Sequence, residues 1–369
     1  MLKKVAYLCL QATKQGQASY AHVNEIIDGL RRNGVEVQLF EPANAEKSLQ
    51  PGIGKRLFDA FWVQFRLIWH IRTFDLLYIR GHFLAFPASI AARLFRVPQV
   101  REVNGPYEDI HQIYPWTRPI APLIRGLSRL QNRLAGTIIT VTPEMAKWCK
   151  EDCGHASVEV VPNGANLDIF HAEAHAPSAP LDAYAIFFGA FSPWQGIDVM
   201  LKAVEHPEWP SNVCLLLAGD GLERPKVESA ANRNERVRYL GTIPYRELPG
   251  FVAPALVGLC VKDDGGTHTS TGWSPLKLYE MMATGIPVVV TDLPGQREIV
   301  EKSRSGLVIQ PGDPAELARA VASLASNPAL AKEMGSRGLL EVRENHSWAR
   351  RANDTLGILQ ETFRRARSA

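Results

Sequence analysis

Two side chains, Lys277 and Glu280, carry the only charges in the stretch from residue 273 to residue 291. Ser274 is a good N-cap and Pro275 suits the first helical position, so we expect a helix with Lys277 in its third position. A cation there opposes the helix macrodipole by about 0.3–1 kcal/mol, unless an anion at the helix N-terminus shares its N–H groups with the ammonium. Glu280 lies on the same helix face and would accept hydrogen bonds from hydroxyls beside that anion. A phosphate next to a ribose fits this pair, and a simple ion pair at the edge of a buried helix is the alternative.

The segments around this helix indicate the fold that positions it. The helix is expected to end before Gly285, and the apolar, β-branched run 286–291 is typical of a buried parallel strand. The chain opens with the same alternation, a strand at 5–10, a helix at 20–32 and a strand at 35–40. The sequence therefore predicts an α/β protein built from doubly wound parallel sheets.

Glycines stand at strand ends in the second half of the chain. Gly189, Gly219 and Gly241 would leave room for a nucleotide lying across the top of a sheet. Gly16, in the loop after the first strand, would let a phosphate approach the backbone or would simply form a turn. The other predicted strands are 76–80, 97–103, 138–142 and 158–161 in the first series and 186–191, 213–218, 237–240 and 256–261 in the second.

Composition excludes several classes of protein. The 369 residues are enough for two domains. The net charge is +3, and residues 1–170 hold 20 Lys and Arg against 15 Asp and Glu. This excess of basic residues is too small to suggest that the protein binds nucleic acid. Five scattered cysteines show no metal or disulfide spacing, which favours a reducing cytoplasm. No segment reaches the roughly 18 apolar residues of a membrane span, and the apolar run after Lys4 is too short for a signal peptide.

Two stretches of the first half combine basic and aromatic residues. Residues 54–73 are rich in Phe and Trp and hold four basic residues against Asp59 alone. Residues 116–133 lie in an acid-free stretch and carry an arginine every four positions from Arg125. Both patterns are typical of amphipathic helices that rest on an anionic membrane. Ordinary domain helices with a solvated basic face are the alternative.

Ordered sequence pieces over nearly the full length resemble the retaining glycosyltransferases of family 4, which have the GT-B fold. The resemblance implies two Rossmann-like doubly wound domains facing across a cleft, with the nucleotide-sugar donor held by the second and the acceptor by the first. The matching pieces are VPNGANLDIF (161–170), FFGAFSPWQGIDVMLKA (187–203), LLLAGDG (215–221), YLGTIPYRELPGF (239–251), SPLKLYEMMATGIPVVVTD (274–292), SGLVIQPGDPAELARAV (305–321) and NHSWARRA (345–352).

The same resemblance sets the expected domains. The acceptor-side domain would span residues 1–172, and a final helix at about 350–369 would pack back on it. The nucleotide-sugar-binding domain would span residues 183–349. The Ala- and Pro-rich segment 171–183 is the expected linker between them.

Site residues follow from the resemblance position by position. Glu280 is assigned to the donor ribose hydroxyls and Lys277 to the diphosphate, while Gly189 and Gly196 border the phosphate loop. An acceptor-side His is often found where this chain has Asn104, so Asn104 joins Lys277 and Glu280 as a candidate catalytic residue. The other candidate donor-binding residues are Gly16, Gln195, Gly219, Gly241, Ile243, Ser274, Pro275 and Leu276.

Three positions depart from the usual family pattern. The first acid of the usual Glu pair is Gly272 here, and the usual Arg and Lys of the phosphate loop are Ala190 and Gln195. The SPLK start of the helix is similar to a subgroup that also tends to lack the first Glu. Asp263 or Asp264 is a candidate replacement for the missing acid, and an exposed pair of loop residues is the other interpretation.

The expected reaction is transfer of a sugar from a nucleotide-diphosphate sugar to a saccharide or lipid-linked acceptor with retention, in cell-surface polysaccharide or glycolipid synthesis. Donor cleavage builds negative charge on the diphosphate, which Lys277 and oriented N–H groups would stabilise. The resemblance implies no metal ion or other cofactor. The expected protein is cytoplasmic, peripheral on the inner face of a membrane, and does not bind nucleic acid. A catalytically silent sugar-nucleotide-binding homologue, or a scaffold of a polysaccharide complex, is the alternative.

Overall fold

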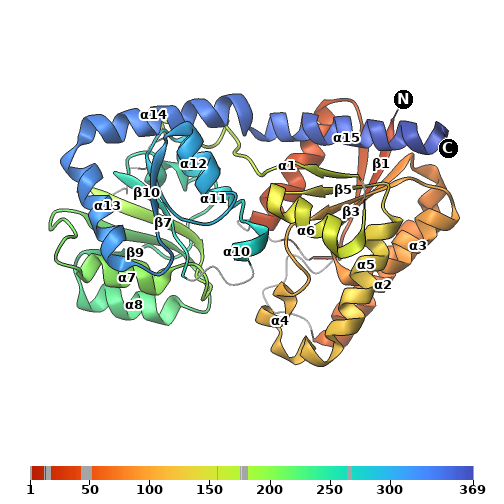
Figure 1. Cartoon of the computed structure of the whole chain (residues 1–369), viewed down its shortest axis with the longest axis horizontal. Coiled ribbons are helices and arrows are strands. Elements are labelled where there is room, and N and C mark those ends of the chain that lie inside the picture. Colours follow the sequence, from red (N-terminus) through yellow and green to blue (C-terminus); the bar gives the residue numbers. More distant parts are fainter. Residues whose placement is uncertain are drawn as a thin grey trace. The chain divides into compact units, whose positions relative to one another are not determined.

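The computed structural model forms two compact units, unit 1 (Met1–Pro162 with Ala349–Ala369) and unit 2 (Asn163–Trp348) (Figure 1). Each unit is built on one six-stranded parallel sheet. The predicted domain boundaries at residues 172 and 183 stay predictions. The structure describes residues 2–11, 13, 18–42, 52–155, 157–174, 176, 182–263 and 268–368, without the side chains of residues 112, 113, 268 and 269.

The first βαβ unit of the chain forms one edge of the sheet in unit 1. In spatial order its strands are β2 (Glu36–Phe40), β1 (Lys4–Leu8), β3 (Leu76–Arg80), β4 (Gln99–Val103), β5 (Thr137–Thr140) and β6 (Val158–Val160). Val5 of β1 lies opposite Val37 on one side and Leu76 on the other. The winding direction therefore switches between β1 and β3, a point where doubly wound sheets bind ligands beyond the carboxyl ends of their strands.

Helices bury the apolar faces of this sheet. Leu8, Leu77 and Ile79 are fully buried with apolar side chains of two of these helices, which explains why strands β1 and β3 read as continuous apolar runs. The helices of unit 1 before residue 162 are α1 (Ala18–Arg32), α2 (Ile53–His70), α3 (Phe86–Leu94), α4 (Asp109–Ile113), α5 (Ala121–Leu134) and α6 (Pro143–Cys153), with the 3-10 turns η1 (Ile71–Thr73), η2 (Phe83–Ala85) and η3 (Pro115–Ile120).

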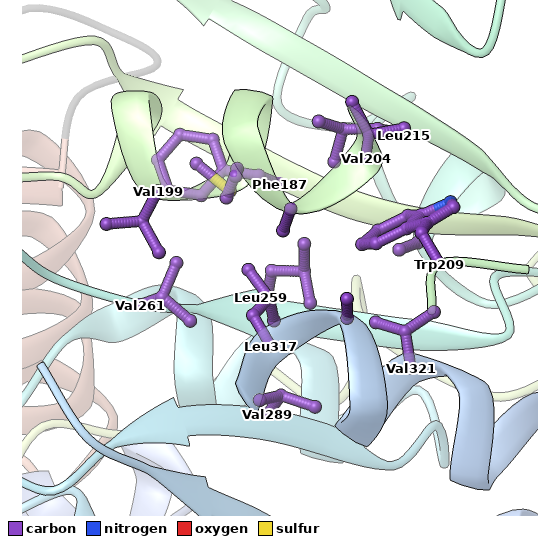
Figure 2. Close-up of a cluster of buried hydrophobic side chains, with 14 of the residues drawn as sticks. Phe187, Val199, Val204, Trp209, Leu215, Leu259, Val261, Val289, Leu317 and Val321 are labelled. Atoms are coloured by element: carbon purple, nitrogen blue, oxygen red, sulfur yellow. The ribbon is translucent and has the colours of Figure 1, made fainter. Parts of the chain in front are cut away.

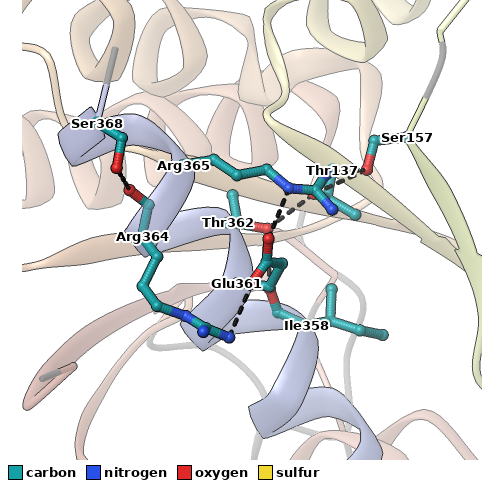
Figure 3. Close-up of polar contacts among 8 residues, drawn as sticks. All are labelled: Thr137, Ser157, Ile358, Glu361, Thr362, Arg364, Arg365 and Ser368. Atoms are coloured by element: carbon teal, nitrogen blue, oxygen red, sulfur yellow. Dashed lines mark hydrogen bonds and ion pairs between the residues drawn. The ribbon is translucent and has the colours of Figure 1, made fainter.

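The C-terminal helix α15 (Trp348–Ser368) belongs to unit 1 from Ala349 onward. Thr362 hydrogen-bonds Thr137 of β5, hydroxyl to hydroxyl, at 2.7 Å. Arg365 donates to Glu361 on its own helix (2.9 Å) and to the Ser157 hydroxyl (3.3 Å), as Figure 3 shows. Helix α15 is therefore fastened to the first unit by side-chain hydrogen bonds more than 200 residues apart in sequence.

Unit 2 repeats the architecture. In spatial order its strands are β12 (Gly306–Ile309), β11 (Val288–Thr291), β10 (Val257–Cys260), β7 (Tyr184–Ala190), β8 (Cys214–Asp220) and β9 (Val237–Tyr239). Strand β7 comes first in the chain and has β8 on one side and β10 on the other. The winding switch of this sheet thus lies between β7 and β10.

Two hydrophobic clusters sandwich the unit 2 sheet. In one, Val199 and Leu317 pack in the same cluster as Leu259 of β10 (Figure 2). Trp209 lies at the edge of this cluster, and its indole N–H donates to Val213 O at 2.8 Å. Burying one such apolar side chain contributes about 1.5–3 kcal/mol. The helices of unit 2 are α7 (Ile197–Glu205), α8 (Arg224–Arg233), α9 (Pro249–Val252), α10 (His268–Thr271), α11 (Leu276–Ala283), α12 (Arg297–Ser303), α13 (Pro314–Ser326) and α14 (Pro328–Asn345).

The predicted fold class is confirmed, because both sheets are parallel and doubly wound. All six strands predicted in unit 1 are present, with ends shifted by up to two residues. In unit 2 the strand β12 was not among the predicted ones. The expected helix start was wrong by one residue, since α11 begins at Leu276 and Pro275 is its N-cap.

Candidate functional site

The candidate site of unit 2 lies at the winding switch. Gln195 follows β7 in the loop before α7, Lys262 follows β10, and Lys277 is in the first turn of α11. The carboxyl ends of neighbouring parallel strands meet at one edge of a sheet, so these three side chains converge there although 82 residues separate the first from the last. This is the position where open α/β sheets bind ligands.

The start of helix α11 differs from the prediction. Ser274 does not cap the helix, because its hydroxyl accepts from the Asn163 backbone N–H (3.2 Å) and pairs with the Tyr279 hydroxyl (2.8 Å). The Asn163 amide also donates to Ser274 O at 2.6 Å, which holds the chain entering the helix. No side chain of the described residues caps the first turn. Lys277 therefore occupies the second helical position of an uncapped N-terminus, which is a stronger anion site than the predicted arrangement.

Two buried ammonium groups meet at one amide oxygen. Lys262 Nζ donates to Gln195 Oε1 at 3.0 Å, and Lys277 Nζ donates to the same oxygen at 3.1 Å. Lys262 also lies over the Trp273 ring, 3.8 Å from its centroid, and Lys277 over the Phe187 ring at 3.7 Å. The two ammonium nitrogens are thus at most about 6 Å apart, and neither forms an ion pair with a carboxylate of the described part of the chain.

Burial dominates the electrostatics of both lysines. It lowers the pKa of Lys262 to about 7, and the neighbouring charge of Lys277 lowers it further, while Cys260 and Asp263 act in the opposite direction. Burial also lowers the pKa of Lys277 to about 8, against raising contributions from Cys260 and Glu280. A bound anion would favour the charged form of each lysine and reverse these shifts. Burying the two ammonium groups side by side therefore costs free energy when no ligand is bound, and an anionic ligand would offset that cost.

Glycines leave space beside these ammonium groups. A Cβ on Gly189 would lie 3.3 Å from Lys277 Nζ, and the φ of 122° at this residue is one that other residues rarely adopt. A Cβ on Gly219 would lie 1.9 Å from the Gly189 carbonyl oxygen, so no side chain fits there. Gly196 is similarly tight against the backbone of Val261. Three of the predicted glycines therefore permit close packing of the strand ends around Lys277.

Glu280 is buried one turn below Lys277. Its Oε1 accepts a 2.8 Å hydrogen bond from the Tyr245 hydroxyl, a partner that sequence reasoning missed. Ile243 lies near this contact, half-buried against the same apolar cluster as Tyr245. Gly241 O accepts from the Gly219 N–H at 2.8 Å. The structure thus brings Glu280 and Gly241, two of the candidate donor-binding residues, to the strand ends beside Lys277.

Unit 1 holds a separate buried network at the end of β4. Glu102 accepts hydrogen bonds from the hydroxyl of Tyr78 (2.5 Å), from Arg80 (2.9 Å) and from the side-chain amide of Asn104, and His22 Nε2 lies 3.0 Å away. Burial alone would raise the pKa of Glu102, but His22 and Arg80 hold it well below its usual range. Glu102 is therefore an ionised, buried carboxylate that sequence reasoning missed.

Asn104 is oriented by this carboxylate. Its amide nitrogen donates to Glu102, and its Oδ1 is buried without a hydrogen-bond partner among the described residues. A buried acceptor without a donor is rare in proteins, and a ligand hydroxyl at this place could donate the missing hydrogen bond. Asn104 lies beyond the carboxyl end of β4 in unit 1, where the sequence predicted an acceptor-side residue.

Some predicted positions lie outside the described residues. These are Gly16 and Asp264, and their assignments stay predictions. Asp263 is described and raises the pKa of Lys262, and its role as a replacement for the first Glu stays a prediction. Within the ranges that the structure describes, no cluster of three or more His, Cys, Asp or Glu side chains has metal-binding geometry. No helix of the described chain is both long and apolar enough to cross a bilayer.

The fold and this site define a class of protein. Doubly wound sheets with cations and close-packed glycines at the winding switch bind phosphate-bearing ligands such as nucleotides. Two family models match the chain, one described as Glycosyl transferases group 1 over residues 182–327 and one as Glycosyltransferase Family 4 over residues 21–169. The chain belongs to the glycosyltransferase superfamily with the GT-B fold.

Individual relatives agree with this assignment. The phosphatidyl-myo-inositol mannosyltransferase of Mycobacterium leprae is 29% identical over 359 residues, which cover 92% of each protein. The chain spans about half the length of two further curated relatives, 50% of one and 57% of the other.

Solved structures share the fold. The sucrose-phosphate synthase of Thermosynechococcus elongatus has a TM-score of 0.78 at 17% identity, over 98% of this chain and 99% of that one. The Anabaena protein HepE, solved in complex with UDP-glucose, has a TM-score of 0.74 at 17% identity, over 97% of this chain and 99% of that one. At 17% identity, these two similarities establish a shared fold and nothing further.

Proposed function

We propose that the protein transfers a sugar from a nucleotide-diphosphate sugar to a saccharide or lipid-linked acceptor, with retention of anomeric configuration. The observation that carries the proposal is the uncapped first turn of α11, where the buried ammonium of Lys277 lies beside Gly189 without a carboxylate partner among the described residues. An anionic ligand at this strand end would compensate such a group. A diphosphate is the anion that a glycosyltransferase of this superfamily would hold.

The roles of the site residues follow from their positions. Cleavage of the donor builds negative charge on the departing diphosphate, and Lys277 together with the N–H groups of the first turn stabilises that charge. Glu280, held by the Tyr245 hydroxyl at 2.8 Å, accepts hydrogen bonds from the ribose hydroxyls. In unit 1, Asn104 Oδ1 accepts a hydrogen bond from a hydroxyl of the acceptor. The SPLK subgroup assignment and a reaction without metal ion or cofactor are part of the same proposal.

The donor and the activity are tested in two steps. A thermal-shift screen with UDP-, GDP- and ADP-sugars identifies the base, since a ligand at 100 times its Kd adds about 2.7 kcal/mol of stability. Release of nucleoside diphosphate from the stabilising donor is then measured with EDTA present. We expect release, and the rate should not depend on EDTA. Stabilisation without any release would favour the catalytically silent homologue instead.

A lipid-linked acceptor fits the surface of α2. One face of this helix exposes four aromatic side chains at helical spacing, which we name the aromatic row: Phe58 (66% exposed), Trp62 (51%), Phe65 (54%) and Trp69 (75%). Successive rings in the row are 5.7–6.4 Å apart between centroids. Exposed Trp and Phe on the face of a basic helix are typical of helices that lie in the headgroup region of a bilayer.

The charge of the surrounding helices supports an anionic bilayer as the proposed occupant of this face. Helix α2 packs on α3, and α3 on α5, and these helices with η3 carry eight Lys and Arg against the single acid Asp59. The prediction for 116–133 needs one correction, because Arg129 pairs with Asp152 (2.7 Å) and Arg133 donates to Cys153 O (3.3 Å). Arg129 and Arg133 thus hold α6, Arg125 pairs with Glu108 (3.6 Å), and the aromatic row carries most of the proposed contact.

Co-sedimentation with lipid vesicles tests this surface. The wild-type protein should pellet with phosphatidylglycerol-containing vesicles at low salt and stay in solution with pure phosphatidylcholine. Replacing Trp62 and Trp69 together by Ser should abolish pelleting, whereas Leu222→Ser, at an exposed apolar residue of unit 2 (81% exposed), should not. Equal pelleting of the double variant and the wild type would contradict the role of the aromatic row.

A further inference from the structure

The phosphate loop of this chain lacks the two cations that its family pattern leads one to expect. Ala190 and Gln195 stand at those positions. Gln195 nevertheless receives a cation from elsewhere in the fold, because Lys262 Nζ donates to its Oε1 at 3.0 Å. Lys262 comes from the end of β10, 67 residues further along the chain. The ammonium that the loop sequence does not encode is thus supplied by the neighbouring strand.

Lys262 forms no ion pair with a carboxylate of the described residues, and Cys260 and Asp263 offset its burial only in part. Its side chain is 3% exposed, its ammonium shares a neutral oxygen with Lys277, and its other close contact is the face of Trp273. Buried charges in proteins are normally paired with an opposite charge or bound to a ligand. An interaction with an aromatic ring and a neutral amide offsets only part of the desolvation of an ammonium. An apolar side chain of similar size would make the fold more stable at this position, so a purely structural role does not explain the lysine.

We infer that Lys262 is the second cation of the diphosphate site, and that it contacts the phosphates of the nucleotide sugar together with Lys277 and the first turn of α11. The inference rests on the proposed function. Gln195 holds the two ammonium groups within about 6 Å of each other, close enough for both to contact one diphosphate. Trp273 and Phe187 form the apolar floor beneath them.

The arrangement couples donor binding to proton uptake. Lys262 faces Lys277 of α11, Cys260 of its own strand and Asp263 in the following loop. The pKa of Lys262 is lowered to about 7 and that of Lys277 to about 8, so at pH 8 the first is mostly neutral and the second about half protonated. A diphosphate would restore the charge of both. The pyrophosphate of a sugar nucleotide is already fully ionised at pH 8. Its binding should therefore be coupled to the uptake of about one proton by Lys262, in addition to the proton uptake by Lys277.

Isothermal titration calorimetry at pH 8, in two buffers of different ionisation enthalpy, tests the inference. UDP-glucose and GDP-mannose are titrated into the wild type, Lys262→Met and Lys332→Met, the last removing an exposed lysine of α14. We expect Lys262→Met to weaken binding about tenfold to a hundredfold, the range for losing a hydrogen bond between charged groups. Its proton uptake should fall by about one proton, and Lys332→Met should match the wild type.

Thermal unfolding without ligand shows whether a weakened variant is simply misfolded. Removal of the buried charge should leave the apparent Tm of Lys262→Met unchanged or raised, most clearly at pH 6, where the wild-type lysine is charged. Unaltered affinity and proton uptake in Lys262→Met would overturn the inference and leave the proposed function intact. Failure of the wild type to bind either sugar nucleotide would instead count against the proposed function itself.

Discussion

Replacing Glu102 by Gln tests how the buried charges of unit 1 are balanced. Glu102 is 1% exposed, and it accepts hydrogen bonds from Tyr78 (2.5 Å) and Arg80 (2.9 Å) with His22 Nε2 at 3.0 Å. Gln has the same shape without the charge, so Arg80 would stay buried without its counter-ion. Removing one partner of a buried ion pair typically costs about 3–5 kcal/mol. We expect the free energy of unfolding to fall by an amount in that range.

Two further variants separate charge from hydrogen bonding. Tyr78→Phe removes one hydrogen bond to the carboxylate and keeps the charge, so its expected cost is about 1.5–3 kcal/mol. Glu159→Gln makes the same change of charge on an exposed residue of β6 and should stay within about 0.5 kcal/mol of the wild type. The expected order of destabilisation is therefore Glu102→Gln, then Tyr78→Phe, then Glu159→Gln.

The contribution of Glu102 to the free energy of unfolding should decrease at low pH. Its pKa in the folded protein lies below the usual value because His22 and Arg80 outweigh the effect of burial. A depressed carboxylate pKa gives stability that is complete above the unfolded-state value of about 4.3 and is lost as pH falls toward the folded-state value. The difference in the free energy of unfolding between wild type and Glu102→Gln should therefore narrow as pH falls below about pH 4.

Urea denaturation followed by far-UV circular dichroism measures this difference at pH 7 and at pH 4. A loss under about 1 kcal/mol at pH 7, or a loss equal to that of Glu159→Gln, would show that Arg80 and His22 are effectively solvated. The account of a buried, charge-balanced network in unit 1 would then be wrong, and so would the reason given for the fixed orientation of Asn104.

Two further predictions concern unit 2. Tyr245→Phe should raise the donor Kd about tenfold or more with little change in kcat, because the hydroxyl that holds Glu280 at 2.8 Å is lost, and an unchanged Kd by calorimetry would contradict this role. The pKa of Lys277 is lowered to about 8 by burial, and the lysine must be protonated to hold the diphosphate, so kcat/KM for the donor should decline as pH rises above about 8. A pH profile of kcat/KM that stays flat up to pH 9.5 would be inconsistent with that requirement.

The sequence predicted the elements whose pattern is local. The predicted strand at Leu76–Arg80 has the observed ends, because a run of buried, mostly apolar side chains up to Ile79 marks it. Strand β12 was missed, since it begins at a glycine and only its last residue is fully buried. Pairing with β11 defines it, as Val289 opposite Leu307 illustrates. Tertiary hydrogen bonds decide such cases, and a single sequence does not contain them.

The candidate site was predictable only in part, for the same reason. Lys277 and Glu280 stood out because a helix-start pattern surrounds them. The role of Ser274 was misjudged, because its hydroxyl is used by Asn163, 111 residues earlier in the chain. Lys262 gave no local signal, since only the adjacency of β10 and β7 brings it to Gln195. Charged residues at the ends of strands beside the winding switch were the pattern that would have found it.

Steady-state turnover of Lys277→Met tests the central claim most directly, which is that the uncapped start of α11 and its buried lysine stabilise the departing diphosphate. Release of nucleoside diphosphate is measured at saturating donor, with Lys332→Met as the control that keeps the site. Loss of one such electrostatic contact lowers kcat about a hundredfold or more, and we predict a decrease of that size for Lys277→Met alone. Wild-type kcat in a folded Lys277→Met protein would contradict the claim.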